Sequence, residues 1–406
     1  MIAFTAGYLL KQHLSDMLPF VWCIIVLTLY VLAFFRGLST IDIVMPIAAI
    51  VLLGIVMLKG KTERMTYVKY VQESALSISF ITYVLLAIFI CICVSGKVVT
   101  WWDDVNFWAS DLKSLYYLNG FAGKYANVSP EFGDYPPAVQ LAKWYIVHLN
   151  RSDFCEGMAF IGYYLFGLSF LMPIYKNVGV KKAYISLPFA IVSWLFAGIA
   201  DKYGYAGFCA DLTMAFIFGA ILIEALRYKK EDGVIPGIRV GLYLAVLTLC
   251  KSTGAIWALF GLVIWCGAFF ANNGKMTARK AINGLWIAVF PFFAGTTWIL
   301  FCLTKHRVTK TTATAITYIT TDDYSISFYT ADFAKAFAKA FFTQPLHVDH
   351  VGITVPPAAM LLTIIVVFYT FIKKEYIRGK GGRFIAWALP IMRVLYCMLF
   401  ILSLIS

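Results

Sequence analysis

The sequence predicts an all-α polytopic membrane protein, and three observations carry this prediction. The 406-residue chain is 61% hydrophobic with a mean hydropathy of +0.79, whereas a soluble domain is about half apolar. Apolar runs of about 17 to 22 residues, long enough as helices to cross a bilayer, recur along its whole length. Basic residues follow every second run, so the net charge of +13 indicates membrane sidedness and not nucleic-acid binding.

About eleven membrane-spanning helices are expected from the apolar runs. Their predicted ranges are 17–35, 43–58, 76–95, 157–174, 183–200, 207–226, 239–250, 254–271, 282–303, 356–372 and 385–406. Every even-numbered span is followed by a basic loop, which places these loops and the N-terminus in the cytoplasm. The cysteines lie mostly inside the apolar runs, where they act as small hydrophobic residues and predict no disulfide framework.

Two long loops, 96–156 and 304–355, then lie on the outer face and carry most of the acids outside the cytoplasm. We expect the whole chain, 1–406, to form one transmembrane domain, and the sequence leaves open whether an extracytoplasmic domain follows Ser406. The first outer loop is large and rich in aromatic residues, and its pattern predicts helices that lie on the membrane surface. The functional face is therefore expected to be the outer one.

The stretch from Trp101 to Trp144 is the part of the chain in which chemistry is expected. At 3.6 residues per turn, its first half places an apolar face on Trp101, Val105, Trp108, Leu112 and Leu115. The opposite, wet face is predicted to hold Asp103, Asn106, Ser110 and Lys113. Asp104 and Asp111, seven residues apart, fall on one edge between these faces.

Two motifs in this loop carry a family resemblance. Trp102 to Trp108 reads WDDVNFW, directly outside a predicted span, and Asp134 to Pro137 reads DYPP. This order resembles the first outer loop of the GT-C superfamily of glycosyltransferases, with the protein O-mannosyltransferases and the lipid A aminoarabinose transferases closest in pattern. Those enzymes have Asp, any residue, then His-Pro-Pro. Here Tyr135 stands in place of the histidine, Asp134 directly precedes it, and Lys143 comes later than the family's lysine.

The resemblance implies an inverting transfer of a sugar from a polyprenyl-phosphate donor to a glycan, lipid or protein acceptor, in a bacterial cell membrane and on its outer face. Such a transfer needs a base for the acceptor hydroxyl and stabilisation of the departing phosphate. By resemblance Asp103 is the base and Asp104 is its partner in binding metal or acceptor. The alternative is structural: Asp103 caps a helix and Asp104 complements the helix dipole.

Further site residues follow from the resemblance. Lys251, in a Lys-Ser-Thr-Gly turn between two predicted spans, is expected to bind the donor phosphate, unless it only extends its ammonium group to the interface. Lys143 and Tyr135 are assigned to the same phosphate. Substrate or metal binding is assigned to Asp211, Asp134 and Asn106, with Asp104 and Asp211 as ligands if a divalent cation such as Mg²⁺ or Mn²⁺ takes part. Asp211 is equally open to interpretation as a hydrated interfacial acid.

Two other functions remain as alternatives. A ligase or polymerase of lipid-linked glycans would depend on Arg and His in the late outer loop, such as Arg307 or His347. A transporter or flippase would place ionisable residues near the bilayer midplane. The predicted spans are nearly uncharged, with Arg393 as an exception, and this distribution argues against transport. The cluster formed by His347, Asp349 and His350 is a weaker candidate metal site, because a loop does not guarantee the geometry that a metal requires.

Overall fold

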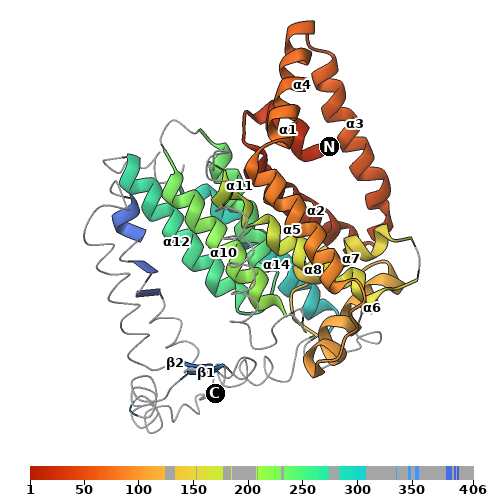
Figure 1. Ribbon diagram of the computed structural model, residues 1–406. Helices are drawn as coiled ribbons and strands as arrows, with labels where there is room; N and C mark the ends of the chain where they lie inside the picture. The colour runs from red at the N-terminus through yellow and green to blue at the C-terminus, as the bar shows by residue number, and fades with distance from the viewer. Residues whose placement is uncertain are drawn as a thin grey trace.

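The computed structural model describes residues 1–123, 133–151, 153–176, 207, 209–229, 233–273 and 284–307, together with Tyr184, Ile282, Lys335 and the stretches 346–348, 353–355, 381–385, 388–389 and 391–392. The described chain is predominantly α-helical (Figure 1), which confirms the predicted class. A short antiparallel hairpin, β1 (Leu346–Val348) with β2 (Ile353–Val355), pairs Leu346 with Val355 and was not predicted.

Residues 2–94 form helices that are joined by short connections. They are α1 (Ile2–Leu10), α2 (Leu14–Phe34), η1 (Leu38–Thr40), α3 (Ile41–Met57), α4 (Lys61–Ala75) and α5 (Ile78–Val94). His13 accepts a hydrogen bond from the backbone N–H of Ser15 and so caps α2, and Ser77 caps α5 in the same way. In Figure 1, α3 and α4 project from the rest of the molecule as a hairpin beside α1.

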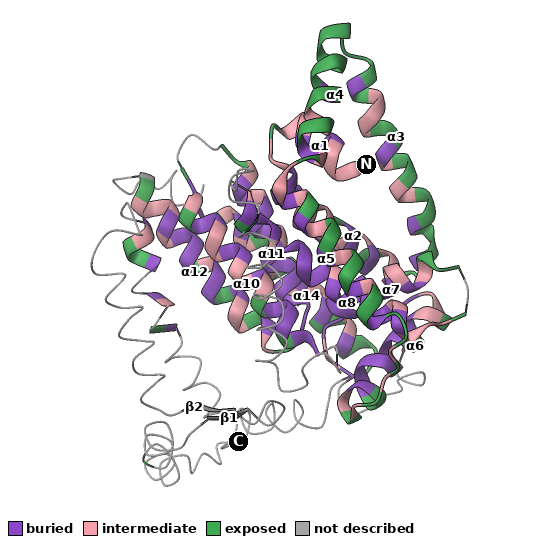
Figure 2. Cartoon of the chain, viewed as in Figure 1, coloured by how far each residue is buried: buried purple, intermediate pink, exposed green. Residues whose placement is uncertain are grey.

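The remaining helices form the main bundle and the loop next to it. They are η2 (Asp104–Trp108), α6 (Ala109–Leu118), α7 (Ala138–Leu149), α8 (Glu156–Ser169), η4 (Met172–Tyr175), α10 (Ala210–Arg227), α11 (Ile235–Thr248), α12 (Gly254–Asn273), η7 (Trp286–Ala288) and α14 (Val289–Thr304). Helix α11 packs against α2, α10, α12 and α14 and is buried over most of its length (Figure 2). The core therefore lies around α11.

Several helices are long and apolar enough to cross a membrane, as expected of a membrane protein. Among the described residues there are four, Leu14–Phe34, Leu38–Met57, Gly254–Asn272 and Trp286–Thr304, or five if α4 and α5, bent by 54°, form one broken span. The Leu38–Met57 span has only 17% of its apolar window buried, so most of its apolar surface is free to contact lipid.

Several predicted features lie outside the described residues. They are most of the spans 183–200, 356–372 and 385–406, the side chain of His347, and Asp349, His350 and Arg393. The count of about eleven spans therefore stays a prediction.

Helices α10 and α11 run antiparallel and connect two polar ends of the bundle. Asp211 lies in the first turn of α10 and Arg227 in its last, a separation of about 25 Å at 1.5 Å per residue. Helix α11 returns from Arg239, near its start, to the turn that carries Lys251. The candidate active site lies at the Asp211 end, and a large polar cavity lies at the Arg227 end.

Candidate active site

The WDDVNFW motif forms a π-helical turn, η2, followed directly by α6. Single π-turns inside helices are rare and often occur at functional sites. Asp103 immediately precedes this turn in a right-handed helical conformation, and its side chain makes no capping hydrogen bond. The interpretation of Asp103 as a simple N-cap therefore finds no support in the geometry.

The faces of this helix differ from the predicted ones. Trp108, Leu112 and Leu115 are buried as expected, but Val105 is 49% exposed. Asp104 is 0% exposed and Asp111 8%, so both lie on the inner face rather than on an edge at the bilayer boundary. Spacings of four, three and four residues connect Asp104, Trp108, Asp111 and Leu115, which is the repeat of one helix face. The π-turn shifts the register that a uniform period of 3.6 assumes.

The charges of these two buried acids raise the pKa of Lys143, a buried residue of α7. The Lys143 Nζ lies 5.5 Å from the centre of the Trp108 ring, and its side chain is fully buried. Burial lowers the pKa of Lys143 to about 7, against the opposing charges of Asp104, Cys209 and Asp111. Lys143 is thus part of a buried acid and lysine cluster, and direct contact with a lipid phosphate would require this interior to open.

The two motifs of the resemblance contact each other in space. The ring of Tyr135 packs edge-on against Phe107, with ring centres 4.9 Å apart, and 6.0 Å from Trp108. Burial raises the pKa of Tyr135, Lys251 lowers it, and the carboxylates of Asp134, Asp211 and Asp103 raise it further. The Tyr135 hydroxyl therefore stays protonated near neutral pH and can donate a hydrogen bond, which a neutral histidine at this position would do only in one tautomer.

Lys251 and Asp211 form an ion pair beside Tyr135. The Lys251 Nζ donates to both carboxylate oxygens of Asp211, at 3.1 and 3.0 Å. Burial alone would lower the pKa of Lys251, but the charge and hydrogen bonds of Asp211 raise it above its ordinary value. Asp211 is 54% exposed in its side chain and Lys251 24%. A permanent positive charge therefore stands at an accessible position.

Backbone contacts fix the segments that carry these side chains. The N–H of Ala138, which follows the DYPP motif, donates to the carbonyl of Leu249 at 2.7 Å. The hydroxyl of Tyr163 in α8 donates to the carbonyl of Cys209, two residues before Asp211, at 2.6 Å. A Cβ on Gly254 would lie 2.1 Å from the carbonyl oxygen of Leu247, so the turn that holds Lys251 requires glycine there.

Arg307 is a residue of this region that sequence reasoning did not assign to the site. It follows the end of α14, is 4% exposed, and approaches Asp111 to 3.6 Å. Its guanidinium donates to the carbonyls of Gly133, at 2.7 Å, and Ala122, at 3.0 Å. It thus holds both ends of the 122–133 segment. A charged residue at the end of an apolar run was the available signal, but its partners lie more than 170 residues away.

The remaining predicted residues are more peripheral. Asn106 is exposed, and its amide donates to the carbonyl of Trp102 at 2.9 Å. The backbone carbonyl of Asp134 accepts from the indole N–H of Trp298 at 2.8 Å, and the Asp134 carboxylate raises the pKa of Tyr135. The Asp103, Tyr135, Asp211 and Lys251 side chains come together at one end of the bundle. Lys143 and Asp104 lie in the interior behind them.

Both predicted metal ligands, Asp104 and Asp211, lie beside lysine side chains. Both oxygens of Asp211 are hydrogen-bonded to an ammonium group, and Asp104 is buried close enough to Lys143 to act on its pKa. Among the residues that the structure describes, no group of three or more His, Cys, Asp or Glu side chains is arranged to hold a metal ion.

Comparisons with family models, with curated proteins and with solved structures found no match to this chain.

Proposed function

We propose that the protein is a membrane glycosyltransferase that moves a sugar from a polyprenyl-phosphate donor to an alcohol acceptor at the outer face of the membrane. One observation carries the proposal: the charges of Asp103, Asp211 and Lys251, spread over about 150 residues of sequence, all act on the Tyr135 hydroxyl, and Lys251 is paired with Asp211. A carboxylate, a protonated phenol and a fixed ammonium are the groups that this transfer requires.

The roles follow from the chemistry of each group. Asp103 takes the proton of the acceptor hydroxyl as its oxygen forms a bond to C1 of the sugar. The bond between C1 and the phosphate oxygen breaks, and the polyprenyl phosphate leaves with its electron pair. Lys251 and the Tyr135 hydroxyl stabilise the charge that develops on that phosphate. Asp211 holds Lys251 in place when no phosphate is bound, and the buried pair of Lys143 and Asp104 supports the turn that carries Asp103.

The orientation is part of the proposal. Residues from all five of the predicted basic cytoplasmic loops, including Lys59, Lys176 and Lys229, line one cavity at the opposite end from Lys251. That distribution supports a cytoplasmic position for the cavity and an outer position for the site. The full count of about eleven spans and a bacterial cell membrane belong to the same proposal.

The ligase alternative is less well supported. It depends on Arg307 or His347 acting on substrate, but the Arg307 guanidinium is buried and engaged with two carbonyls and Asp111. These contacts support a structural role for Arg307. A requirement for its charge with no requirement for Asp103 would favour the alternative.

The test is the release of polyprenyl phosphate by the purified full chain, assayed with a panel of polyprenyl-phosphate hexoses and pentoses. Asp103→Asn should lower the turnover by about 10² to 10⁴, because the amide keeps the shape and removes the base. Asp153→Asn, an exposed acid of the same loop, is the matched control and should retain turnover within about twofold. Wild-type turnover in Asp103→Asn, or no release from any donor by the wild type, would contradict the proposal.

A further inference from the structure

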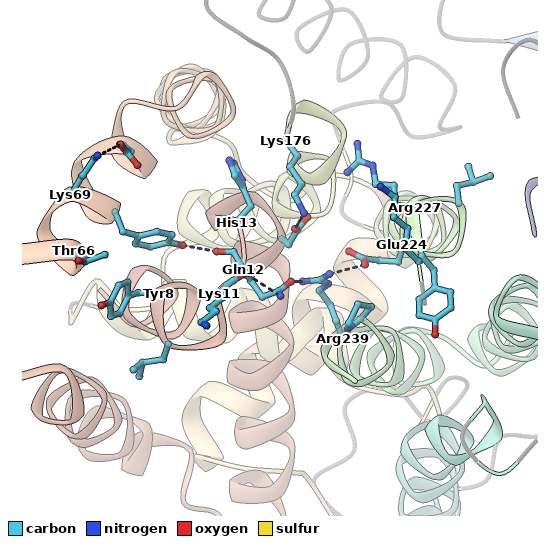
Figure 3. Close-up of a pocket in the computed structure, with 18 of the residues that line it drawn as sticks. Tyr8, Lys11, Gln12, His13, Thr66, Lys69, Lys176, Glu224, Arg227 and Arg239 are labelled. Carbon is cyan, nitrogen blue, oxygen red and sulfur yellow. Dashed lines mark hydrogen bonds and ion pairs between the residues drawn. The ribbon is translucent and has the colours of Figure 1, made fainter. Parts of the chain in front are cut away.

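A second polar region lies at the end of the bundle opposite the candidate active site. It is a cavity of about 1420 Å³ between the α1 and α4 side of the molecule and the ends of α10, α11 and α12. Figure 3 shows Tyr8, Lys11, Thr66 and Lys69 on one side of it and Lys176, Arg227 and Arg239 on the other. The cavity thus separates the projecting hairpin from the main bundle.

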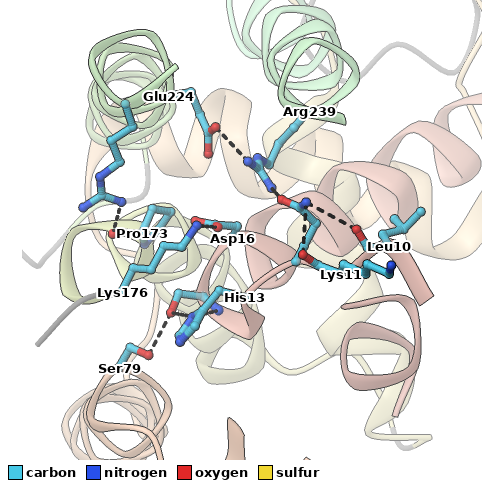
Figure 4. Close-up of polar contacts among 12 residues, drawn as sticks. Leu10, Lys11, His13, Asp16, Ser79, Pro173, Lys176, Glu224 and Arg239 are labelled. Atoms are coloured by element: carbon cyan, nitrogen blue, oxygen red, sulfur yellow. Dashed lines mark hydrogen bonds and ion pairs between the residues drawn. The ribbon is translucent and has the colours of Figure 1, made fainter. Parts of the chain in front are cut away.

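Each carboxylate that lines this cavity has a cationic partner within it. Glu224 accepts from the Arg239 guanidinium at 2.8 Å (Figure 4). Arg239 also donates to the side chain of Gln12 (Figure 3). The remaining pairs are Asp16 with Lys176, Glu63 with Lys59 and Glu73 with Lys69. The acids are therefore neutralised by groups of the cavity itself.

The lining contains seven Lys and Arg side chains against four carboxylates, so it carries an excess of three positive charges. Lys11 and Arg227 are among the cations that form no ion pair in the set above. Lys11 is exposed at the end of α1. Arg227 lies in the last turn of α10, and one of its guanidinium nitrogens donates to the carbonyl of Pro173. The guanidinium has further N–H donors that an anion could accept from. An anion placed between them would connect the two sides of the cavity.

We propose that this cavity binds the phosphate of an anionic phospholipid from the cytoplasmic leaflet. Guanidinium and ammonium groups are the usual partners of phosphate, and basic pockets at helix ends on this side of a membrane suit anionic headgroups. One candidate span begins at Leu14 beside the cavity and another ends at Asn272 in its lining, which is the arrangement expected of a site at headgroup depth. In the second half of α3, which leads to the cavity at Lys59, the exposed side chains of Val51 and Ile55 provide an apolar surface for the acyl chains.

The source of the phosphate is the point to be tested, because a soluble phosphate compound shares the same chemistry. The thermal midpoint of the purified full chain in neutral detergent is measured during titration with phosphatidylglycerol, with phosphatidylcholine and with sodium phosphate. Phosphatidylglycerol should raise the midpoint of the wild type, whereas the other two should not. A ligand that binds the folded chain and not the unfolded chain raises the thermal midpoint in this way.

The variant Lys11→Gln/Arg227→Gln removes two charges from the cavity and should raise the half-saturating phosphatidylglycerol concentration about tenfold or more. Lys61→Gln/Arg64→Gln is the matched control, because it removes two charges from α4 outside the cavity lining, and should stay within about twofold of wild type. If the double variant is poorly folded without lipid, Lys11→Gln alone serves, since this exposed side chain makes no packing contact in the core.

Three results would overturn the proposal. Equal protection by phosphatidylcholine would show that the charge of the lipid plays no part in binding. Equal lipid affinity of the cavity variant and the control would show that the lipid does not bind in the cavity. Protection by sodium phosphate, lost in the cavity variant, without protection by phosphatidylglycerol would assign the site to a soluble phosphate compound.

Discussion

Replacing Lys251 with glutamine separates phosphate binding from folding at the candidate active site. The change removes the ammonium that donates to both oxygens of Asp211 and keeps a side chain of similar length. Because Asp211 is 54% exposed, the ion pair contributes only about 0 to 1 kcal/mol to stability. The Asp211 carboxylate can return to solvent, so the thermal midpoint should change little.

The effect on the donor should be much larger. A hydrogen bond to a charged group contributes about 1.5 to 3 kcal/mol, which corresponds to about 10- to 150-fold in affinity. The raised pKa of Lys251 keeps its charge at neutral pH, so the whole contribution is present there. The apparent dissociation constant for polyprenyl phosphate should therefore increase by that factor in Lys251→Gln.

Both quantities are measured on the same purified sample, polyprenyl-phosphate affinity by titration and stability by thermal unfolding. Lys113→Gln is the control, because Lys113 also forms an ion pair with a carboxylate, that of Glu156, at 3.1 Å and has no assigned role. An affinity change of Lys251→Gln within about twofold, or one accompanied by an equal loss of stability, would refute the assignment of Lys251 to the phosphate.

Three further predictions concern stability. Gly254→Ala should lower the free energy of unfolding by about 1 to 3 kcal/mol, because its Cβ would meet the Leu247 carbonyl, whereas Gly219→Ala in α10 meets no atom within 4 Å and should be neutral or stabilising in the same thermal unfolding measurement. Arg307→Met should cost about 3 to 5 kcal/mol, because it breaks the ion pair of the buried Asp111. Adding Asp111→Asn should recover part of this loss, and no recovery would argue against the pair. Burial lowers the pKa of His13 from its ordinary value of 6.5, opposed by Asp16 and assisted by Lys176 and Arg227, so the unfolded chain binds more protons as the pH falls through that value and stability decreases. His13→Asn keeps a cap acceptor for Ser15 and should lose less stability than the wild type between about pH 7.5 and 5.5; parallel pH profiles would contradict this.

The sequence by itself determined the helical elements and their polar ends. The long apolar runs became α2, α3, α12 and α14 because a continuous apolar segment must satisfy its own backbone hydrogen bonds, and the helix does so locally. The basic loops, separated in sequence, predicted one polar end, and Lys59, Lys176 and Lys229 indeed line one cavity there. The WDDVNFW and DYPP motifs directed attention to Asp103 and Tyr135, which lie with Lys251 and Asp211 in one region.

Only the tertiary structure decided which side chains of these motifs are buried. A uniform helical period placed Val105 inside and Asp104 at an edge, and the π-turn of η2 reversed both. The partners of Arg307, the Asp111 carboxylate and the carbonyls of Gly133 and Ala122, are separated from it by most of the bundle's sequence. Periodicity reports neighbours within a few residues along one helix, whereas the pairing of buried charges depends on which helices meet. Sequence pattern therefore located the polar groups, and packing between helices selected their partners.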